Sequence, residues 1–442
     1  MASPVSNLNL ATNLYAKFLA ERDVMPMVYS SDFGYNVVQQ IIDITNKNGS
    51  VRVDQPRFEI PKLGNISIAQ TLGAAPTLVG TYLRITFSAA NNNFRLKDGV
   101  MDSNFVLGRV VNIVSPTQVD LMPVSVTSWN TSTHFQSGMT AKVGFDISGN
   151  YSSRGKSNLV YTPDLDYNYT AITRESSSQA RRDRISTYIK WEGDYWWHSQ
   201  QALTMQAFAK QQEFKYFYST RGSITTPDEG EAYTTGGIRW NIINNGGNYY
   251  PISNDLTQTS FTDILYDYSM RVAANGRKVV ALMGKAAMWN LNLNVTGSYV
   301  LNAGDRNTFG GMKVNGLSVN QYSVGNTSID YVHYPLLDDP TLFPEISSIT
   351  GKPKNSSTIL LMDMSPVPSA DGSGSIPVIQ KRHFGEQEYI HTYQNGMIKY
   401  DGTRMGDFEV SSSDVDGAEF QLLCDDGLYV VPERLGLIEL SA

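Results

Sequence analysis

The sequence predicts an α+β protein, and three observations point to that class. Residues 199–218 form the longest helical pattern, without Gly or Pro and rich in good helix formers. Residues 82–147 consist instead of short β-type runs separated by turn residues, which is typical of a small β-domain of about five strands. From 260 to 380 helical and strand patterns alternate, and 419–440 has the pattern of a strand, a turn and a strand.

Length and composition limit the protein class. The chain has 442 residues, of which 41% are apolar and 17% charged. This length supports two or three domains with a real core, and the composition is neither disordered nor highly charged. The net charge of -7 argues against a nucleic-acid binder that works by neutralising phosphates. It leaves room for a protein that sits beside nucleic acid.

Targeting and redox features are few. The N-terminus has no basic segment followed by an apolar block, and no later run approaches the ~18 apolar residues of a membrane helix. The single cysteine, Cys424, excludes an internal disulfide and fits a reducing cell. We therefore expect a soluble protein made in the cytosol, without a membrane partner.

Extended segments flank the β-domain. Residues 8–21 predict a short amphipathic helix, and 51–63 then alternates but contains two prolines, which favours an exposed arm over a central strand. Extended polar chain resumes at 158–190. The β-domain at 82–157 is therefore expected to be inserted between two extended segments.

Two helices are clearest in the second half. The apolar face of the helix at 199–218 is expected to comprise Leu203, Ala207, Phe214 and Phe217. A Gly- and Asn-rich loop at 221–252 follows, of a length that is usually functional or interfacial. Ser260 is expected to cap the next helix, with Asp263 at its third position. The buried stripe of that helix is expected to comprise Phe261, Ile264, Leu265, Tyr268 and Val272.

The best match to a metal site is a calcium-loop pattern. Asp164, Asp166, Asn168 and Glu175 stand at its positions 1, 3, 5 and 12. Position 6 needs a glycine for the sharp turn, and here it is Tyr169. We therefore expect a strand at this place and no metal site.

Other chemical motifs are incomplete. Gly284-Lys285 resembles a phosphate loop, but Val279 replaces the first glycine and Ala286 the metal-binding hydroxyl. Gly284 is better interpreted as the break between a strand at 278–283 and a helix. Cys424 is expected to be a small buried apolar side chain rather than a nucleophile. No catalytic residue and no cofactor is expected.

The stretch DYVHYPLLDDP, at 330–340, places a histidine among aspartates. Strand alternation puts Asp330 and His333 on opposite faces, so they cannot share a metal. Pro335 ends the strand, and Asp338 and Asp339 belong to a turn. We expect a strand that leads into a loop, with His333 as a packed strand residue.

The strongest charge feature is a group of arginines, namely Arg174, Arg181, Arg182 and Arg184. As a nucleic-acid patch they lack interleaved aromatic residues. They would suit ion pairing between an extended arm and a neighbouring subunit, and the alternative is a solvated strand. We take them as intersubunit contact candidates.

The order of elements resembles the major capsid proteins of tailed bacteriophages, which have the Hong Kong ninety-seven shell fold shared with encapsulins and herpesvirus capsid floors. The likeness is carried by ANGRKVVALMGKAAMWNL, by IDYVHYPLLDD followed by STILLMDMSPV, and by GAEFQLLCDDGLYVVPERLGLIEL. The resemblance implies an N-terminal arm at 1–50, an extended loop at 51–81 with 158–197, a spine helix and loop at 198–259, and axial and peripheral α+β domains at 260–442. The inserted β-barrel-like domain at 82–157 departs from the family pattern as an elaboration, and the family does not give its role.

The resemblance also implies a function. A non-enzymatic protein would self-assemble, through hexameric and pentameric capsomers, into an icosahedral head shell around double-stranded DNA. Portal and auxiliary capsid proteins would be its partners, and contact with the packaged DNA would be non-specific. It would be made in the host cytoplasm and reside in the virion shell. Scaffolding would be a separate protein, because no large segment precedes the arm.

Two other classes of protein are alternatives. Aromatic, Asn-rich strands suggest a carbohydrate-binding or tail-fibre-like β-rich virion protein, but no repeated strand unit occurs along the chain. A hydrolase built on 260–442 would need convergent acid and base residues, and the sequence contains no such group.

Overall fold

The computed structural model describes most of the chain in two compact units. Unit 1 comprises residues 1–60 and 167–442, and unit 2 comprises residues 61–166. The described residues are 37–45, 50–62, 69–89, 94–149, 164–180, 190–191, 194–228, 230–253, 256–272, 278–290, 312–314, 317–324, 327–348, 351–368, 374–386, 388–396 and 416–440. The helix expected at 8–21 lies outside them.

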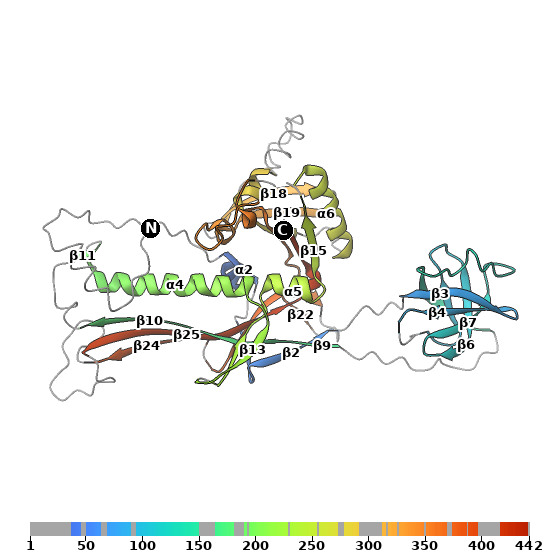
Figure 1. Ribbon diagram of the computed structural model, residues 1–442, viewed down its shortest axis with the longest axis horizontal. Coiled ribbons are helices and arrows are strands. Elements are labelled where there is room, and N and C mark those ends of the chain that lie inside the picture. The colour runs from blue at the N-terminus through green and yellow to red at the C-terminus, as the bar shows by residue number, and fades with distance from the viewer. Residues whose placement is uncertain are drawn as a thin grey trace. The chain divides into compact units, whose positions relative to one another are not determined.

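Unit 2 contains a closed six-stranded barrel (Figure 1). Its strands follow the order β3-β4-β7-β6-β5-β8 around the barrel. They are β3 (Ala69–Val79), β4 (Tyr82–Phe87), β5 (Asp98–Met101), β6 (Leu107–Ser115), β7 (Gln118–Pro123) and β8 (Thr140–Asp146). Leu83, Ile85 and Leu121 are completely buried inside it, together with Phe135. The barrel therefore has a core of its own, which closure of the sheet makes possible without an exposed edge.

The bounds of this domain differ from the expected ones. We placed 51–81 in an extended loop and began the inserted domain at 82. In the structure β3 pairs with β4 and with β8, so residues 69–79 belong to the barrel. The error has a physical reason: β3 is exposed along most of its length, and its polar, small-residue sequence lacks the alternation of a core strand.

The larger sheet of unit 1 has seven strands in the order β15-β26-β20-β16-β19-β18-β17. They are β15 (Asn248–Ile252), β16 (Lys278–Met283), β17 (Met312–Val314), β18 (Leu317–Val324), β19 (Thr327–His333), β20 (Ile359–Asp363) and β26 (Leu435–Leu440). Every residue of β20 and β26 is buried, because both faces of the sheet are covered. One face packs on helix α6 (Gln258–Arg271), and the other packs on residues of α2, α4 and α5.

The second sheet of unit 1 supports the longest helix. Strands β1 (Val51–Val53), β23 (Ile379–Phe384), β25 (Gly417–Val430) and β10 (Ala171–Ala180) follow one another across it, and β24 (Tyr389–Asn395) also pairs with β25. Helix α4 (Trp196–Tyr218) runs along β10 and β25 (Figure 1). Residues 171–180, which we expected in the extended loop, pair with β25 over their whole length and belong to this sheet instead.

Shorter elements complete unit 1 and the connection to unit 2. They are α2 (Val37–Thr45), α5 (Ile238–Asn244), the hairpin β13 (Gly222–Thr226) with β14 (Gly230–Thr234), the pair β11 (Lys190–Trp191) with β12 (Asp194–Tyr195), and the pair β21 (Val367–Pro368) with β22 (Ser375–Ile376). Strands β2 (Arg57–Lys62) and β9 (Asp164–Tyr169) pair where the chain passes between the units. The stretch expected as a loop at 221–252 thus contains a hairpin, α5 and β15.

The expected helix at 260 begins earlier. The helix is capped by Thr257, whose hydroxyl accepts a hydrogen bond from the Ser260 amide. In return, the Ser260 hydroxyl accepts a hydrogen bond from the Thr257 amide. This reciprocal capping box fixes the first turn, so Ser260 is a helical residue and not the cap. The expected stripe is otherwise confirmed, because Phe261, Leu265 and Tyr268 are buried against the seven-stranded sheet.

Truncating a buried side chain of the barrel core should destabilise the barrel but not the rest of the chain. We expect Leu121→Ala to cost about 2–5 kcal/mol, because the side chain is fully buried and leaves a cavity. Hydrogen exchange should rise within 69–146 and stay unchanged in β16. The control Leu96→Ala removes a side chain that is 50% exposed and should change stability by less than about 0.5 kcal/mol. Equal acceleration in both units would contradict an independent barrel core.

Candidate functional site

Helix α4 turns a partly polar stripe toward the sheet beneath it. Thr204, Phe208, Gln212 and Tyr216 recur every four residues and are all buried. Phe208 packs on Phe420 and Leu422 of β25. The face that we expected was partly wrong, because Leu203 and Phe214 are 38% and 39% exposed. A search for apolar residues alone misses a helix that buries hydrogen-bonding side chains.

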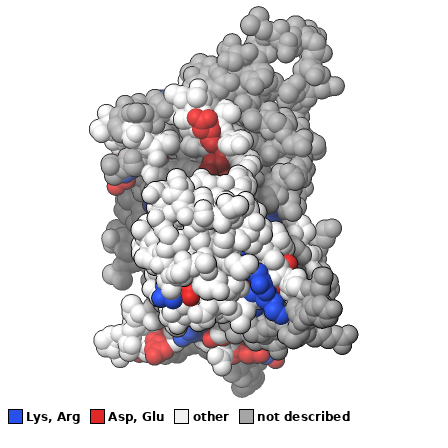
Figure 2. Space-filling model, turned by 90° about the vertical axis from the view of Figure 1, so that its right-hand side faces the viewer, with Lys and Arg blue, Asp and Glu red and all other residues white. Residues whose placement is uncertain are grey.

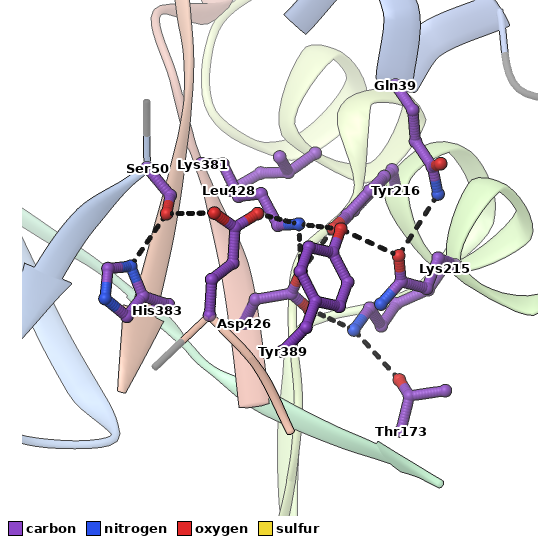
Figure 3. Close-up of polar contacts among 12 residues, drawn as sticks. Gln39, Ser50, Thr173, Lys215, Tyr216, Lys381, His383, Tyr389, Asp426 and Leu428 are labelled. Carbon is purple, nitrogen blue, oxygen red and sulfur yellow. Dashed lines mark hydrogen bonds and ion pairs between the residues drawn. The ribbon is translucent and has the colours of Figure 1, made fainter. Parts of the chain in front are cut away.

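Asp426 of β25 is the centre of the polar cluster under α4 (Figure 3). Its carboxylate is completely buried and accepts hydrogen bonds from the Lys215 ammonium and the Tyr216 hydroxyl, both on α4. The ammonium of Lys381, on β23, lies 3.1 Å from Oδ2 of Asp426, the oxygen that also accepts from Tyr216. One carboxylate therefore joins a helix to two strands of the sheet.

A second layer extends the cluster to the segment before β1. Lys381 donates to Glu388 at 2.6 Å, and Glu388 in turn accepts from the Ser50 hydroxyl at 2.6 Å. The same hydroxyl lies 2.9 Å from Nδ1 of His383. Figure 3 shows these residues as one connected chain of contacts. The start of β1 is thereby held to β23 by side chains as well as by backbone pairing.

The charges of the cluster stabilise one another. Burial opposes ionisation of Asp426, but the nearby Lys215 and Lys381 outweigh it and hold the pKa of this carboxyl at about 2. Burial also opposes ionisation of Glu388, and Lys381 and Ser50 lower its pKa on balance. Burial opposes the charged form of Lys381, but the nearby Asp426 and other neighbours outweigh this effect, so the pKa of Lys381 is raised. Asp426, Glu388 and Lys381 thus remain charged.

This arrangement suits a structural role better than a catalytic one. Each charge of the cluster is engaged by an opposite charge, and burial raises the pKa of the neighbouring Cys424 thiol, which keeps it un-ionised. Among the described residues no group of three or more His, Cys, Asp and Glu side chains could hold a metal. A closed, mutually neutralised cluster fixes geometry and offers no free acid, base or nucleophile.

Another α4 carboxylate holds helix α2. Glu213 is completely buried, and it accepts hydrogen bonds from the backbone amides of Val38 at 2.6 Å and Gln39 at 3.2 Å. These amides belong to the first turn of α2, where backbone N–H groups lack helical partners. Gln39 also donates to the Gln212 side chain at 3.2 Å. Helix α4 therefore clamps the N-terminal end of α2, and we call these contacts the Glu213 clamp.

Arg174 is the one predicted contact candidate within the described residues. It lies on β10 and is exposed. With Ile390 and Leu423 it lines an open groove of about 600 Å³ on the sheet. Because side chains alternate along β10, Arg174 lies on the other face of the sheet from Thr173 and Glu175, which contact Lys215 and Gln211 of α4. Arg181, Arg182 and Arg184 lie outside the described residues, so their role stays a prediction.

The stretch at 330–340 has the expected form, with one contact that we missed. β19 ends at His333, and a single 3₁₀ turn follows at Pro335–Asp338. That turn brings Asp338 back to His333, whose Nε2 lies 2.5 Å from the carboxylate. Asp338 also accepts from the Lys285 amide at 3.0 Å. The contact joins a loop to a strand and a helix start.

Two other sequence interpretations agree with the structure. Residues of the calcium-loop pattern lie on strands β9 and β10, where the sequence predicted a strand. Gly284 stands between β16 and the helical residues 285–290. A Cβ at Gly284 would lie 2.3 Å from the Ser356 carbonyl oxygen, which explains the glycine by close backbone approach.

Comparison with known proteins gives matches in structure. No protein-family model matches the chain, and no curated protein sequence does. The capsid of a native GTA particle is similar at a TM-score of 0.43 and 10% identity, covering 99% of this chain and 100% of that one. A structure from Gordonia phage Cozz has a TM-score of 0.44 and 10% identity, covering 100% and 97%. The holo-SrpI encapsulin complex of Synechococcus elongatus has a TM-score of 0.37 and 12% identity, covering 63% and 76%.

Within the described part of the chain, no helix is both long and apolar enough to span a bilayer.

Removing the central charge should destabilise unit 1. Asp426→Asn removes the anion that contacts both Lys215 and Lys381, and Glu388 remains as an anion beside Lys381, so we expect a loss of about 3–5 kcal/mol in unfolding free energy. Asp54→Asn is the control, because the exposed Asp54 pairs with Arg52 at 3.6 Å and should matter by less than about 1 kcal/mol. Chemical denaturation measures both. Equal effects would contradict a central role for Asp426.

The Glu213 clamp should make stability depend on pH. Burial, partly offset by the two amides, raises the Glu213 pKa to about 8 from 4.5. The folded chain therefore binds more protons than the unfolded chain between these values, so stability should fall as pH rises, by on the order of 1.4 kcal/mol per unit. Glu213→Gln removes the titration while keeping an oxygen acceptor. Its melting temperature should fall less steeply than wild type from pH 5 to 8, and identical slopes would contradict the assignment.

Proposed function

We propose that this chain is the major structural protein of an icosahedral shell, the head of a tailed bacteriophage. The observation that carries the proposal is the joining of α4, the second sheet and α2 into one rigid body by buried polar contacts, which are ionic around Asp426 and hydrogen-bonded at Glu213. This body leaves a sheet face and helix surfaces open. Such a body suits repeated placement in a lattice, and the order of its elements matches the shell fold expected from the sequence.

Exposed apolar side chains on several elements support association with partners. On α4 these are Leu203, Met205 and Phe214, and on α6 Tyr266 and Met270 are each 66% exposed. Tyr266 and Met270 stand four residues apart and share one helical face. Monomeric proteins seldom keep several such surfaces, whereas a shell subunit makes different contacts with different neighbours.

Assembly is the mechanism that this proposal assigns to the chain. Each copy contributes many weak heterologous contacts that close into rings and then into a shell. A net charge of -7 suits a container for DNA, because strong phosphate contacts would bind the packaged polymer in a salt-sensitive manner. The chain itself needs no cofactor and performs no chemical step.

We extend the proposal to the partners of the chain and to its location. Hexameric and pentameric capsomers, a portal, auxiliary capsid proteins and non-specific proximity to packaged DNA would complete the particle after synthesis in the host cytoplasm. Arg174, Arg181, Arg182 and Arg184 are proposed as intersubunit contacts. The exposed position of Arg174 beside an open groove supports this for one of the four.

The alternatives have less support. A hydrolase needs an accessible acid and base, but the ionised cluster around Asp426 is buried and mutually neutralised. A carbohydrate-binding or tail-fibre-like protein would be expected to have repeated strand units. The described strands instead form one barrel and two unequal main sheets.

Electron microscopy tests the proposal directly. Purified full-length protein, concentrated at physiological salt, should form closed shells, rings or tubes in negative stain. The control Asp426→Asn should give fewer ordered particles, because the body that carries the contacts is weakened. Dispersed wild-type monomers at every concentration and salt, with the chain folded by circular dichroism, would contradict a shell protein.

A further inference from the structure

One end of the barrel exposes an unusual number of apolar side chains. They lie on the β3–β4 hairpin, at the end of β7 and in the loop before β6. Their exposed fractions run from 39% for Val79 and Tyr82 to 80% for Phe105. We call this set the hairpin-end patch; it comprises Leu78, Val79, Tyr82, Phe105, Met122 and Val124.

Strand pairing brings the members of the patch together. Val79 pairs with Tyr82 across the β3–β4 turn. On the next strand Leu83 pairs with Leu121, so Tyr82 and Met122 are neighbours one step further out. The Val124 amide donates to the Leu107 carbonyl at 3.1 Å, two residues after Phe105. The patch therefore covers one end of the barrel without a break in the pairing.

Phe105 is held in an unfavourable backbone conformation with its ring in solvent. Its φ is 62°, in the left-handed region that residues with a Cβ seldom adopt. The nearly buried Asp102 fixes the loop, since its carboxylate accepts from the amides of Asn104 at 2.8 Å, Val106 at 2.9 Å and Phe135 at 3.1 Å. A loop that stores strain to display an aromatic ring is typical of a binding position.

Two of the segments that build this end contain no charged residue. Residues 63–83 and 121–141 contain no Lys, Arg, Asp or Glu. Unit 2 as a whole has eight basic and six acidic residues, whereas the rest of the chain has 27 basic and 36 acidic ones. Figure 2 shows a broad face with few charged side chains. Copies of an acidic chain repel one another least where they meet through such a surface.

We propose that the hairpin-end patch binds the same patch of a second copy of this chain. An uncharged apolar surface is complementary to itself, so like patches can meet around a symmetry axis. Phe105 supplies the aromatic anchor that usually dominates such a contact. This inference rests on the proposed function in so far as a shell contains many copies. It adds that the barrel joins subunits to one another.

Replacing Phe105 separates association from folding. Phe105→Asn removes the ring, and asparagine tolerates the left-handed conformation, so the melting temperature should be unchanged or higher. Self-association of the full chain should weaken at least about tenfold in sedimentation velocity. The matched control, Phe145→Asn, removes another exposed barrel ring outside the patch (52% exposed) and should leave association unchanged. An unchanged association of Phe105→Asn would overturn the proposal.

Crosslinking tests whether the hairpin-end patches of two copies face each other. The one native cysteine, Cys424, is fully buried, so an added cysteine is the accessible one. Tyr82→Cys should form covalent dimers with a short bismaleimide. Ser88→Cys, at the other end of β4 and roughly 20 Å away, should not. Crosslinking of neither, or of Ser88→Cys alone, would overturn contact between like patches.

The two proposals fail in different ways. Normal wild-type shells together with normal shells from Phe105→Asn would leave the shell function standing and remove this contact. Wild-type protein that forms no shell but associates reversibly, and loses that association in Phe105→Asn, would support the contact and contradict the shell. A patch that binds an added separate protein while the chain alone stays monomeric would overturn the proposed partner.

Discussion

The buried carboxylate of Asp426 is the contact on which unit 1 depends most. It receives Lys215 and Tyr216 from α4 and lies beside Lys381 of β23, so one residue holds a helix against a sheet. A buried ion pair gains little over an apolar contact in stability, but it requires one arrangement of its partners. The Glu213 clamp extends this requirement to α2. Rigid geometry, rather than chemistry, is the property that these buried polar contacts supply.

The two units differ in their charge and in the composition of their cores. Unit 1 carries the Asp426 cluster and most of the acidic residues, while the barrel of unit 2 has an apolar core and an almost uncharged end. A barrel without open edges can display apolar side chains with less risk of strand-to-strand aggregation than an open sheet. The strained Phe105 fits this division, because a rigid barrel can hold a costly backbone conformation that a flexible loop would relax.

Periodicity predicted the elements of the chain better than their contacts. The apolar strand β16 and the stripe of α6 followed from residue spacing, because their apolar side chains pack into one core cluster. The polar stripe of α4 was missed, since Gln212 and Tyr216 are buried with hydrogen-bond partners on other elements, which residue spacing does not identify. The cluster itself joins Ser50, Lys215 and Asp426 from distant parts of the chain. Only the folded topology, which pairs β1, β23 and β25, brings them together.

Hydrogen exchange of the wild-type subunit across increasing denaturant best tests whether α4, β25 and α2 open as one cooperative unit. If the buried charges join these elements, the amides of 205–218, 417–430 and 38–42 should share one opening free energy close to that of unit 1. Strand β4 of the barrel should follow an independent curve. Separate openings of α4 and β25, well below global unfolding, would contradict the central role given to Asp426.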